Sequence, residues 1–470
     1  MFKDLKNCFD HLSTEHLRSE FFASSGTLIQ PTSYVIDRVY VTTKNKQGYT
    51  GKYVNICGQY IPLSLSFKSF FETSDTLDLT LNYMSSIPKD SAVMENFIQG
   101  KLWAMKRSKY SEQDIVIPYF LSGDDVEVNN PLSSHSGKVM AMYASFPCLP
   151  PECRSQLKNM LLVLLYESWV RNTNNKMIST NNIYRPLVNG IKFLEEKGIQ
   201  INTCTGTKTV YFVLGLILGD NLGLHGLLGF TESFVVTYYC RFCKLSKNEC
   251  KNTFVTLPEL KRTPKNYEED IKLNNISQTG IKEECVFHKI RSFHCTQNFS
   301  VDEMHDIRES LAHDDIIAIL RALTFEKSEF YSFPLSELNN RLLMFDYGPI
   351  DCSNRPTPIR EEDIKSETKL KITAAELTTL AKYLGILIKD LVDQSNPYWN
   401  LYILLREILD FTLAKKVTKT QIIGFKFVVI RHHILYKELT GKHLKPKFHF
   451  ITHYSEICQE SDPVSHLSSI

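Results

Sequence analysis

The chain has 470 residues, of which 43% are hydrophobic and 23% charged, so it can bury more than one core. Its length predicts two or three domains. Its 54 basic and 52 acidic residues leave a formal charge of +2, which excludes a polycation or an acidic disordered protein. The 12 cysteines are scattered and no apolar leader follows Met1, so we expect reduced thiols or metal ligands rather than a disulfide framework. Asp220 and His225 interrupt the most apolar stretch, 210–230, which is therefore interpreted as core and not as a membrane span.

The N-terminal region, 1–110, is predicted to be β-rich and accessory to the main core. Strand-like patterns cover Tyr34–Thr43 and Tyr53–Leu63, and a helical pattern covers Val93–Lys109. The first strand-like stretch and its surroundings carry the basic residues Arg38, Lys44, Lys46 and Lys52. No helix-turn-helix or zinc-finger signature accompanies them, so no motif supports sequence-specific DNA recognition by this region. Its role is left unassigned.

The pattern of apolar residues changes near Asp114, and we take this change as the start of a central region, 111–330. Three short apolar runs, an amphipathic helix and a long apolar strand follow in order: 115–121, 138–146, 157–166, 184–197 and 209–218. The last run is nearly unbroken, as expected of a strand covered on both faces. This β-β-β-α-β order predicts an α/β fold with a ribonuclease H-like mixed-sheet core.

The rest of the chain is predicted to be mostly helical. A Cys/His-containing insertion at about 238–300 precedes a helix that begins near Ser300 and carries Glu309. The C-terminal region, 331–470, shows its clearest helical patterns at 374–391 and 399–413.

Several blocks of this sequence resemble the transposase domain of the CACTA (En/Spm-type) DNA transposons and their transposon-derived relatives in animal genomes. The resemblance covers roughly residues 114–323 and one later block. Its residues, in chain order, are Asp124–Leu132, Leu149–Arg154, Pro186–Leu194, Gly219–Gly229, Cys240–Cys243, Val301–His305 and Lys447–Tyr454.

The resemblance implies a DDE-type transposase that cleaves DNA and transfers strands in the nucleus, acting as a homo-oligomer without a membrane or a small-molecule substrate. In relatives a glycine follows the acid of the helix motif, whereas Ser310 follows Glu309 here, and the chain ends shortly after the last block. A truncated or decayed copy is therefore an alternative.

Three acids, Asp124, Asp220 and Glu309, are the candidate catalytic and metal-binding residues. Carboxylates from separate elements can hold two Mg²⁺ or Mn²⁺ ions about 3.5–4 Å apart, as phosphoryl transfer on DNA requires. Asp125 and Asp306 are the substitutes. The alternative is that these acids have no functional role and lie at strand ends and on helix faces because charged side chains stay in contact with water. Asp306 would then be an exposed position early in its helix, where a negative charge suits the helix dipole.

A structural zinc site is predicted in the insertion. Cys240 and Cys243 have the spacing of half a zinc site, and Cys285 with His294 is the expected second pair. Buried free thiols are the alternative. His305 is expected to pack beside Asp306 or to support the acids.

A basic segment, 415–447, contains nine Lys or Arg residues and one acid, Glu438. Its aromatic neighbours suit a surface that follows a DNA backbone, and a solvated helix face is the alternative. Two rival functions also stay open. One is a non-enzymatic DNA- or chromatin-associating protein derived from a transposase, and the other is an unrelated α/β protein whose zinc-braced insertion binds proteins.

Overall fold

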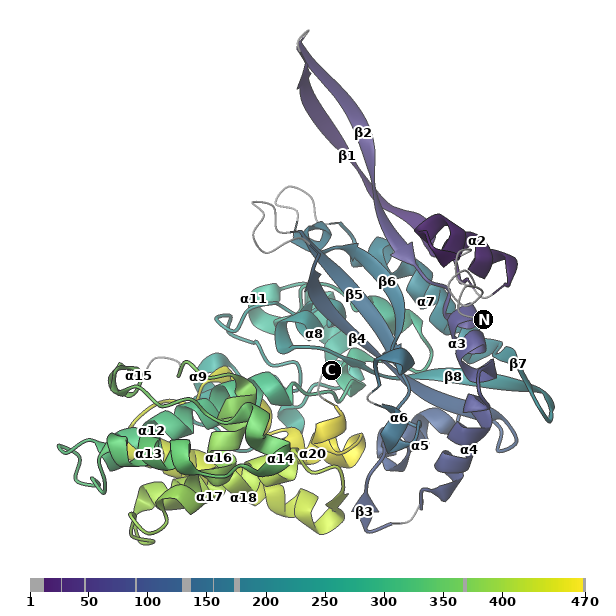
Figure 1. Ribbon diagram of the computed structural model, residues 1–470. Helices are drawn as coiled ribbons and strands as arrows, with labels where there is room; N and C mark the ends of the chain where they lie inside the picture. The colour runs from purple at the N-terminus through teal and green to yellow at the C-terminus, as the bar shows by residue number, and fades with distance from the viewer. Residues whose placement is uncertain are drawn as a thin grey trace. The chain divides into compact units, whose positions relative to one another are not determined.

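The structure is a computed structural model (Figure 1) that describes residues 12–26, 28–45, 48–88, 91–128, 137–154, 156–172, 178–366 and 370–467. The chain divides into two compact units. Unit 1 comprises Met1–Ile87, Lys106–Ile217 and Val286–Phe293, and unit 2 comprises Pro88–Met105, Leu218–Cys285 and His294–Ile470. This division differs from the three predicted regions because each unit is assembled from segments far apart in the sequence.

Unit 1 is built on a mixed sheet of seven strands, β1-β2-β6-β5-β4-β8-β7. The strands are β1 (Thr32–Asn45), β2 (Gly48–Tyr60), β4 (Ile115–Glu127), β5 (Lys138–Ser145), β6 (Leu161–Glu167), β7 (Ile199–Thr203) and β8 (Gly206–Leu218). The pairs β1/β2, β2/β6, β4/β5, β5/β6 and β7/β8 are antiparallel. The predicted N-terminal strands therefore extend the main sheet and form no sheet of their own.

Aromatic packing explains why the middle of the sheet is buried. Phe67 on α3 (Leu63–Glu72) lies 4.9 Å from Phe146 and 5.0 Å from Phe212 between ring centroids. These side chains are at most 1% exposed, and β8 is buried continuously from Phe212 to Leu218. The apolar stretch that begins at Val210 is thus a core strand followed by a buried helix, and no described helix is long and apolar enough to cross a membrane.

The remaining helices of unit 1 match the sequence-based expectations only in part. Helix α7 (Thr180–Glu196) is the predicted amphipathic helix, and it buries Ile183, Leu187, Ile191 and Leu194 on one stripe. The others are α2 (Glu15–Ser24), α4 (Thr76–Ser86) and α6 (Pro151–Arg154). The boundary between the two units falls within α5 (Lys101–Arg107). The predicted helix over Val93–Lys109 is shorter because Val93–Met94 pairs with Val417–Thr418 as β3 and β9.

Unit 2 is mostly helical. It contains α8 (Asn221–Leu228), α9 (Lys247–Cys250), α10 (Pro264–Leu273), α11 (Ile276–Thr279), a π-helix labelled η8 (Met304–Leu311), α12 (Ala312–Thr324), α13 (Leu335–Met344), α14 (Gly348–Asp351), α15 (Glu361–Lys365), α16 (Ala374–Ile388), α17 (Pro397–Thr412), α18 (Lys419–Thr440), α19 (Pro446–Ile451) and α20 (Tyr454–Glu460). The two predicted C-terminal helices correspond to α16 and α17. A second short sheet, β3-β9, also lies in this unit.

Candidate functional site

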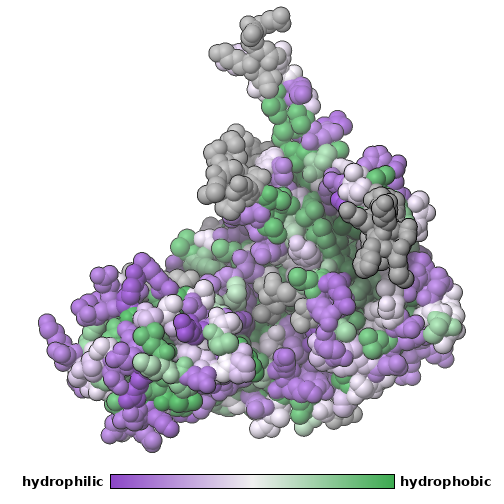
Figure 2. Space-filling view, in the orientation of Figure 1, coloured by the Kyte–Doolittle hydropathy of each residue, from purple (hydrophilic) through white to green (hydrophobic). Residues whose placement is uncertain are grey.

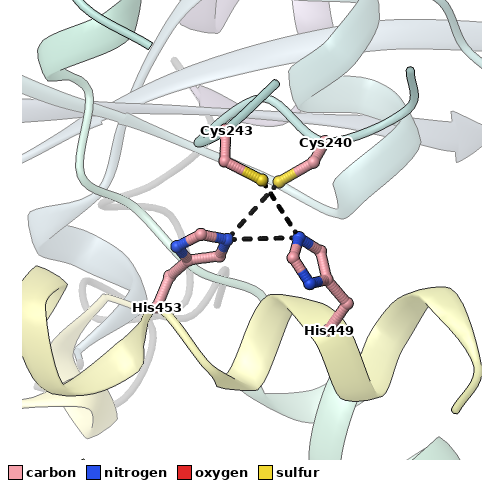
Figure 3. A group of neighbouring side chains, drawn as sticks. All are labelled: Cys240, Cys243, His449 and His453. Atoms are coloured by element: carbon pink, nitrogen blue, oxygen red, sulfur yellow. Dashed lines mark hydrogen bonds between the residues drawn. The ribbon is translucent and has the colours of Figure 1, made fainter. Parts of the chain in front are cut away.

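Four buried side chains in unit 2 form a Cys₂His₂ cluster (Figure 3). Their potential ligand atoms, the sulfurs of Cys240 and Cys243 and ring nitrogens of His449 and His453, all lie within 4.8 Å of one another. The Cys243 sulfur is 3.2 Å from Nε2 of His449, the Cys240 sulfur is 3.6 Å from Nε2 of His453, and the two Nε2 atoms are 3.3 Å apart. The cluster could hold a metal such as zinc.

The spacing of these atoms matches tetrahedral zinc. Zinc–sulfur bonds of about 2.3 Å and zinc–nitrogen bonds of about 2.05 Å place neighbouring ligand atoms roughly 3.3–3.8 Å apart at a tetrahedral angle. The three distances above are 3.2, 3.6 and 3.3 Å. The donor set is also one that zinc prefers, and all four positions come from protein side chains. The residues present therefore fit a closed zinc site.

The two cysteines are held on an irregular loop after α8. Arg262 fixes this loop because its side chain donates a 2.9 Å hydrogen bond to the Cys240 carbonyl and a 2.7 Å bond to that of Thr279. A backbone bridge between Cys243 and Lys261 supports the second cysteine. Helices do not position these sulfurs, so the loop depends on the buried Arg262 for its shape.

The two histidines come from neighbouring short helices. His449 lies on α19 and His453 is the N-cap residue of α20, four residues later. Both are buried, and the His453 ring lies 5.2 Å from the Phe242 ring between centroids. The Lys261 ammonium pairs with Glu456 on α20 and so joins the cysteine loop to the histidine helices.

The electrostatics of the cluster favour a thiolate beside an imidazolium when no metal is bound. Burial alone would raise the pKa of Cys240, but its contacts with Cys243 and His449 hold that pKa well below the ordinary value. Burial alone would lower the pKa of His449, whereas the neighbouring Cys240 raises it to about 10. A divalent cation would replace the imidazolium proton as the partner of the thiolate.

The structure does not bring the predicted second ligand pair, Cys285 and His294, to Cys240 and Cys243. Nδ1 of His294 is 2.8 Å from the Thr296 hydroxyl, and neither residue belongs to the cluster around Cys240. His449 and His453 complete the site because α19 and α20 pack against the cysteine loop. Their His-x₃-His spacing was the missed signal, since this spacing is common in zinc sites.

The first candidate acid and its substitute lie on β4, in unit 1. Asp124 and Asp125 are exposed and pair with Ala141 and Met140 of β5, so the strand extends past both. The Ser168 hydroxyl donates a 2.6 Å hydrogen bond to Asp125. Successive strand residues point to opposite faces, so only one of the two acids can serve a given site. The end of the transposase-like block, residues 129–132, lies outside the described residues.

The second candidate acid, Asp220, directly follows β8 in the chain and is the N-cap of α8, where its side chain accepts a hydrogen bond from the Gly223 N–H. This cap explains why the helix begins at Asn221. A carboxylate has two oxygens with several acceptor sites, so capping leaves acceptor capacity that a metal can use.

Glu309, the third candidate, is half-buried on the π-helix η8. A π-turn is rare and often marks a functional site, because its wider backbone displaces side chains from their α-helical positions. The neighbouring His305 is half-buried, and its Nδ1 lies 2.9 Å from Asp302, the contact that holds it at the start of this helix.

Asp306, the substitute for Glu309, is fully buried and is not the exposed position that its early place in the helix suggests. The Asn221 amide donates a 2.7 Å hydrogen bond to it, and the Tyr454 hydroxyl donates one of 3.0 Å. Burial raises the pKa of Asp306 to about 8, and the charge of Asp302 adds to this effect. Asp306 therefore serves as a buried connecting group in the fold.

A network of buried polar groups connects the cysteine loop with the segments that carry two of the acids. Arg241, between the two cysteines, donates a 2.6 Å hydrogen bond to the Asn221 side chain and a 3.0 Å bond to the Ser300 carbonyl. The Asn221 backbone N–H donates a 3.0 Å bond to Asp302. Arg241, next to Cys240, is thus directly hydrogen-bonded to Asn221, next to Asp220.

The basic segment is only partly available for a partner. Lys416 pairs with Glu95, and Lys445 lies 2.7 Å from Asp314. The aromatic residues Phe425, Tyr436 and Phe448 are buried and pack the core, while Phe427 is 60% exposed. Helix α18 carries three exposed basic residues: Lys419, Lys426 and Arg431.

Comparison of the sequence with models of known protein families finds no match, and comparison with curated proteins finds none either.

Proposed function

We propose that this chain is a transposon-derived protein of the DDE transposase type, which in its active form cuts and joins DNA. The strand order β6-β5-β4-β8 carries the proposal. It places the third, second, first and fourth strands of the predicted core side by side, an order that resembles a ribonuclease H-like sheet. Asp124 lies near the end of the first of these strands, and Asp220 follows the fourth.

In this proposal Asp124, Asp220 and Glu309 hold two Mg²⁺ or Mn²⁺ ions. One ion activates the attacking oxygen, first of water and then of a DNA 3′ hydroxyl, and the other stabilises the leaving oxygen. Carboxylates suit these ions because both are hard cations that prefer oxygen ligands.

The Cys₂His₂ cluster has a structural role in the proposal. Four protein ligands leave no open position for water or substrate, so zinc held there would brace the fold and take no part in the reaction. Arg241 and Tyr454, which flank the ligands, reach Asn221 and Asp306. Zinc would therefore fix the backbone beside Asp220 and Glu309.

A plasmid-nicking assay tests the function without knowledge of a target sequence. The full chain, loaded with zinc, is incubated with supercoiled plasmid and Mg²⁺ or Mn²⁺. We expect nicking that Asp124→Asn, Asp220→Asn and Glu309→Gln each reduce at least about 100-fold, because loss of even a supporting residue around a metal costs 10–100-fold. The exposed acid Glu362 gives the matched control, Glu362→Gln, which keeps full activity.

Absence of any metal-dependent nicking by the wild-type chain, with duplex binding retained, would contradict the enzymatic proposal. That result would favour the DNA- or chromatin-associating protein, in which the fold persists without the reaction.

A further inference from the structure

The N-terminal hairpin extends from the sheet as a two-stranded arm, Arg38–Asn45 with Gly48–Asn55 (Figure 1). Among the described strands only Gln59 and Tyr60 of β2 pair with β6, opposite Leu165 and Leu164. From Asn55 outward, the partner of β2 is β1 alone, in a continuous register that ends at Asn45 and Gly48. Within the described residues, the arm therefore has no third strand.

The arm exposes large side chains that the sheet does not cover. Tyr40, Tyr49 and Tyr53 are 61%, 72% and 73% exposed. Hydrophobic and hydrophilic residues both show on the visible side of the arm (Figure 2). An isolated two-stranded hairpin is marginally stable in water, and unpaired strand edges invite association. A ribbon of this length is thus a surface suited to a partner.

The charge of the arm points to an anionic partner. Residues 38–54 contain four basic residues, Arg38, Lys44, Lys46 and Lys52, and no acid. Arg38 and Lys52 are exposed, and no ion pair joins either one to an acid in the part of the chain that the structure describes. Lys46 lies outside that part. A polyanion would supply the missing negative charge.

The register divides these groups between the two faces of the ribbon. Tyr40 lies opposite Tyr53 on the face that also carries Arg38, and the two rings are 5.2 Å apart edge to face. Tyr40 also lies over Gly51, where a Cβ would be 2.0 Å from its hydroxyl oxygen. Lys52 points to the opposite face, so each face carries a cation.

We propose that this arm binds duplex DNA by entering the major groove. That groove, about 12 Å wide, admits a two-stranded β-ribbon, and phosphates line both of its walls. A cation on each face suits such a groove, and the tyrosine hydroxyls can hydrogen-bond to base edges or phosphates. The choice of DNA as the polyanion rests on the proposed function, but the arm needs no catalytic acid.

A second copy of this chain is the rival occupant, since strand edges can also pair with each other. Two arms with four basic residues and no acid each would repel, however, so self-pairing is disfavoured.

The experiment measures binding of the full chain to a fluorescent mixed-sequence 30-base-pair duplex in EDTA, over a range of salt concentrations. One variant, Arg38→Gln/Lys52→Gln, removes charge alone. A second variant shortens the arm by joining Val39 to Val54 through an Asn-Gly turn. The pair Val39/Val54 is an even number of residues from the terminal pair Asn45/Gly48, so the shortened hairpin keeps the side chains on their original faces. The exposed lysines Lys272 and Lys371 give the control, Lys272→Gln/Lys371→Gln.

We expect the charge variant to weaken binding about 10-fold or more near 0.15 M salt and to reduce the salt slope by about 2, since each phosphate contact contributes about 0.9. The shortened arm should lose at least as much, and the control should match wild type. Unchanged affinity and slope in both arm variants would overturn the proposal. So would stronger competition by single-stranded DNA of equal length, or a wild-type dimer that becomes monomeric on shortening while DNA affinity stays unchanged.

Failure here is distinguishable from failure of the proposed function. A chain that binds duplex through the arm yet never nicks plasmid refutes only the enzymatic role, and a chain that nicks with an unimportant arm refutes only this inference.

Discussion

The side-chain amide of Asn221 donates a 2.7 Å hydrogen bond to a buried carboxylate oxygen of Asp306. Each residue lies close in the chain to a candidate acid, Asn221 next to Asp220 and Asp306 three positions before Glu309. The bond thus holds the start of α8 against the π-helix η8. Since Arg241 and Tyr454 join the same network, the cysteine loop and the histidine helices are tied to both segments.

Removal of Asn221 should therefore destabilise unit 2. Asn221→Ala removes one buried hydrogen-bond partner from Arg241 and one from Asp306, and each buried polar atom left unsatisfied costs about 1–3 kcal/mol. We expect the free energy of unfolding in urea to fall by about 2–4 kcal/mol in total. The adjacent control Leu222→Ala, at a side chain that is 41% exposed, should lose less than about 1 kcal/mol. Equal losses in the two variants would contradict the network.

The Cys₂His₂ cluster predicts one zinc ion per chain, bound by Cys240, Cys243, His449 and His453. His449→Ala and Cys243→Ser should abolish zinc retention after dialysis against a weak chelator, as elemental analysis would measure. Each should also lower the free energy of unfolding by at least about 3 kcal/mol, because zinc affinity contributes to folding.

Two controls sharpen this test. His443 is exposed in the same region, so His443→Ala should keep its zinc. Cys285→Ser/His294→Ala should keep it too. Loss of zinc from that double variant, with retention in His449→Ala, would reverse the ligand assignment.

The raised pKa of Asp306, about 8, predicts a specific pH dependence of stability. Between pH 4 and 8 the folded chain keeps this proton while the unfolded chain, with a carboxyl pKa near 3.9, has released it. The contribution of Asp306 to stability therefore falls as pH rises towards 8. Asp306→Asn removes that titration and keeps the shape, so the variant should gain stability relative to wild type from pH 5 to pH 8. Parallel stability curves would refute the assignment.

The exposed cations of α18 should contribute to DNA affinity without affecting the fold. Lys419→Gln/Lys426→Gln/Arg431→Gln removes three cations, and we expect the salt slope of duplex binding to fall by about 2–3. A control triple at the exposed lysines 272, 371 and 389 should leave the slope unchanged. Thermal unfolding of both triples should stay within a degree or two of wild type, since surface substitutions cost little. An unchanged slope in the first triple would assign these cations to a solvated face.

Local patterning predicts the sheet strands better than their partners. Continuous apolar runs identify β4, β5, β6 and β8 because each is buried between other layers. The short strand β7 was missed, since Ile199–Thr203 follows a helix directly and has only two buried residues. The extension of the sheet by β1 and β2 was also missed, because only the short stretch Gln59–Ile61 connects the described part of this hairpin to β6.

The metal cluster shows again that local sequence patterns do not predict contacts between distant segments. The Cys240-x-x-Cys243 spacing predicts half of the site, but some 200 residues separate it from His449 and His453, and no local pattern records which distant helix packs against a loop. Nearby candidates such as Cys285 then look equally suitable. The burial of Asp306 likewise depends on Tyr454 and Asn221, which come from distant segments.

Manganese binding measured by electron paramagnetic resonance tests the central claim most directly. The zinc-loaded chain, bound to duplex DNA, is titrated with Mn²⁺, and the account predicts about two bound ions per chain, as a two-metal site requires. The Asp124→Asn/Asp220→Asn/Glu309→Gln variant should bind none at this site, while Glu362→Gln binds as wild type does. The same number of bound ions in the triple variant and in wild type, or none in wild type, would contradict the claim that these three acids form a two-metal centre.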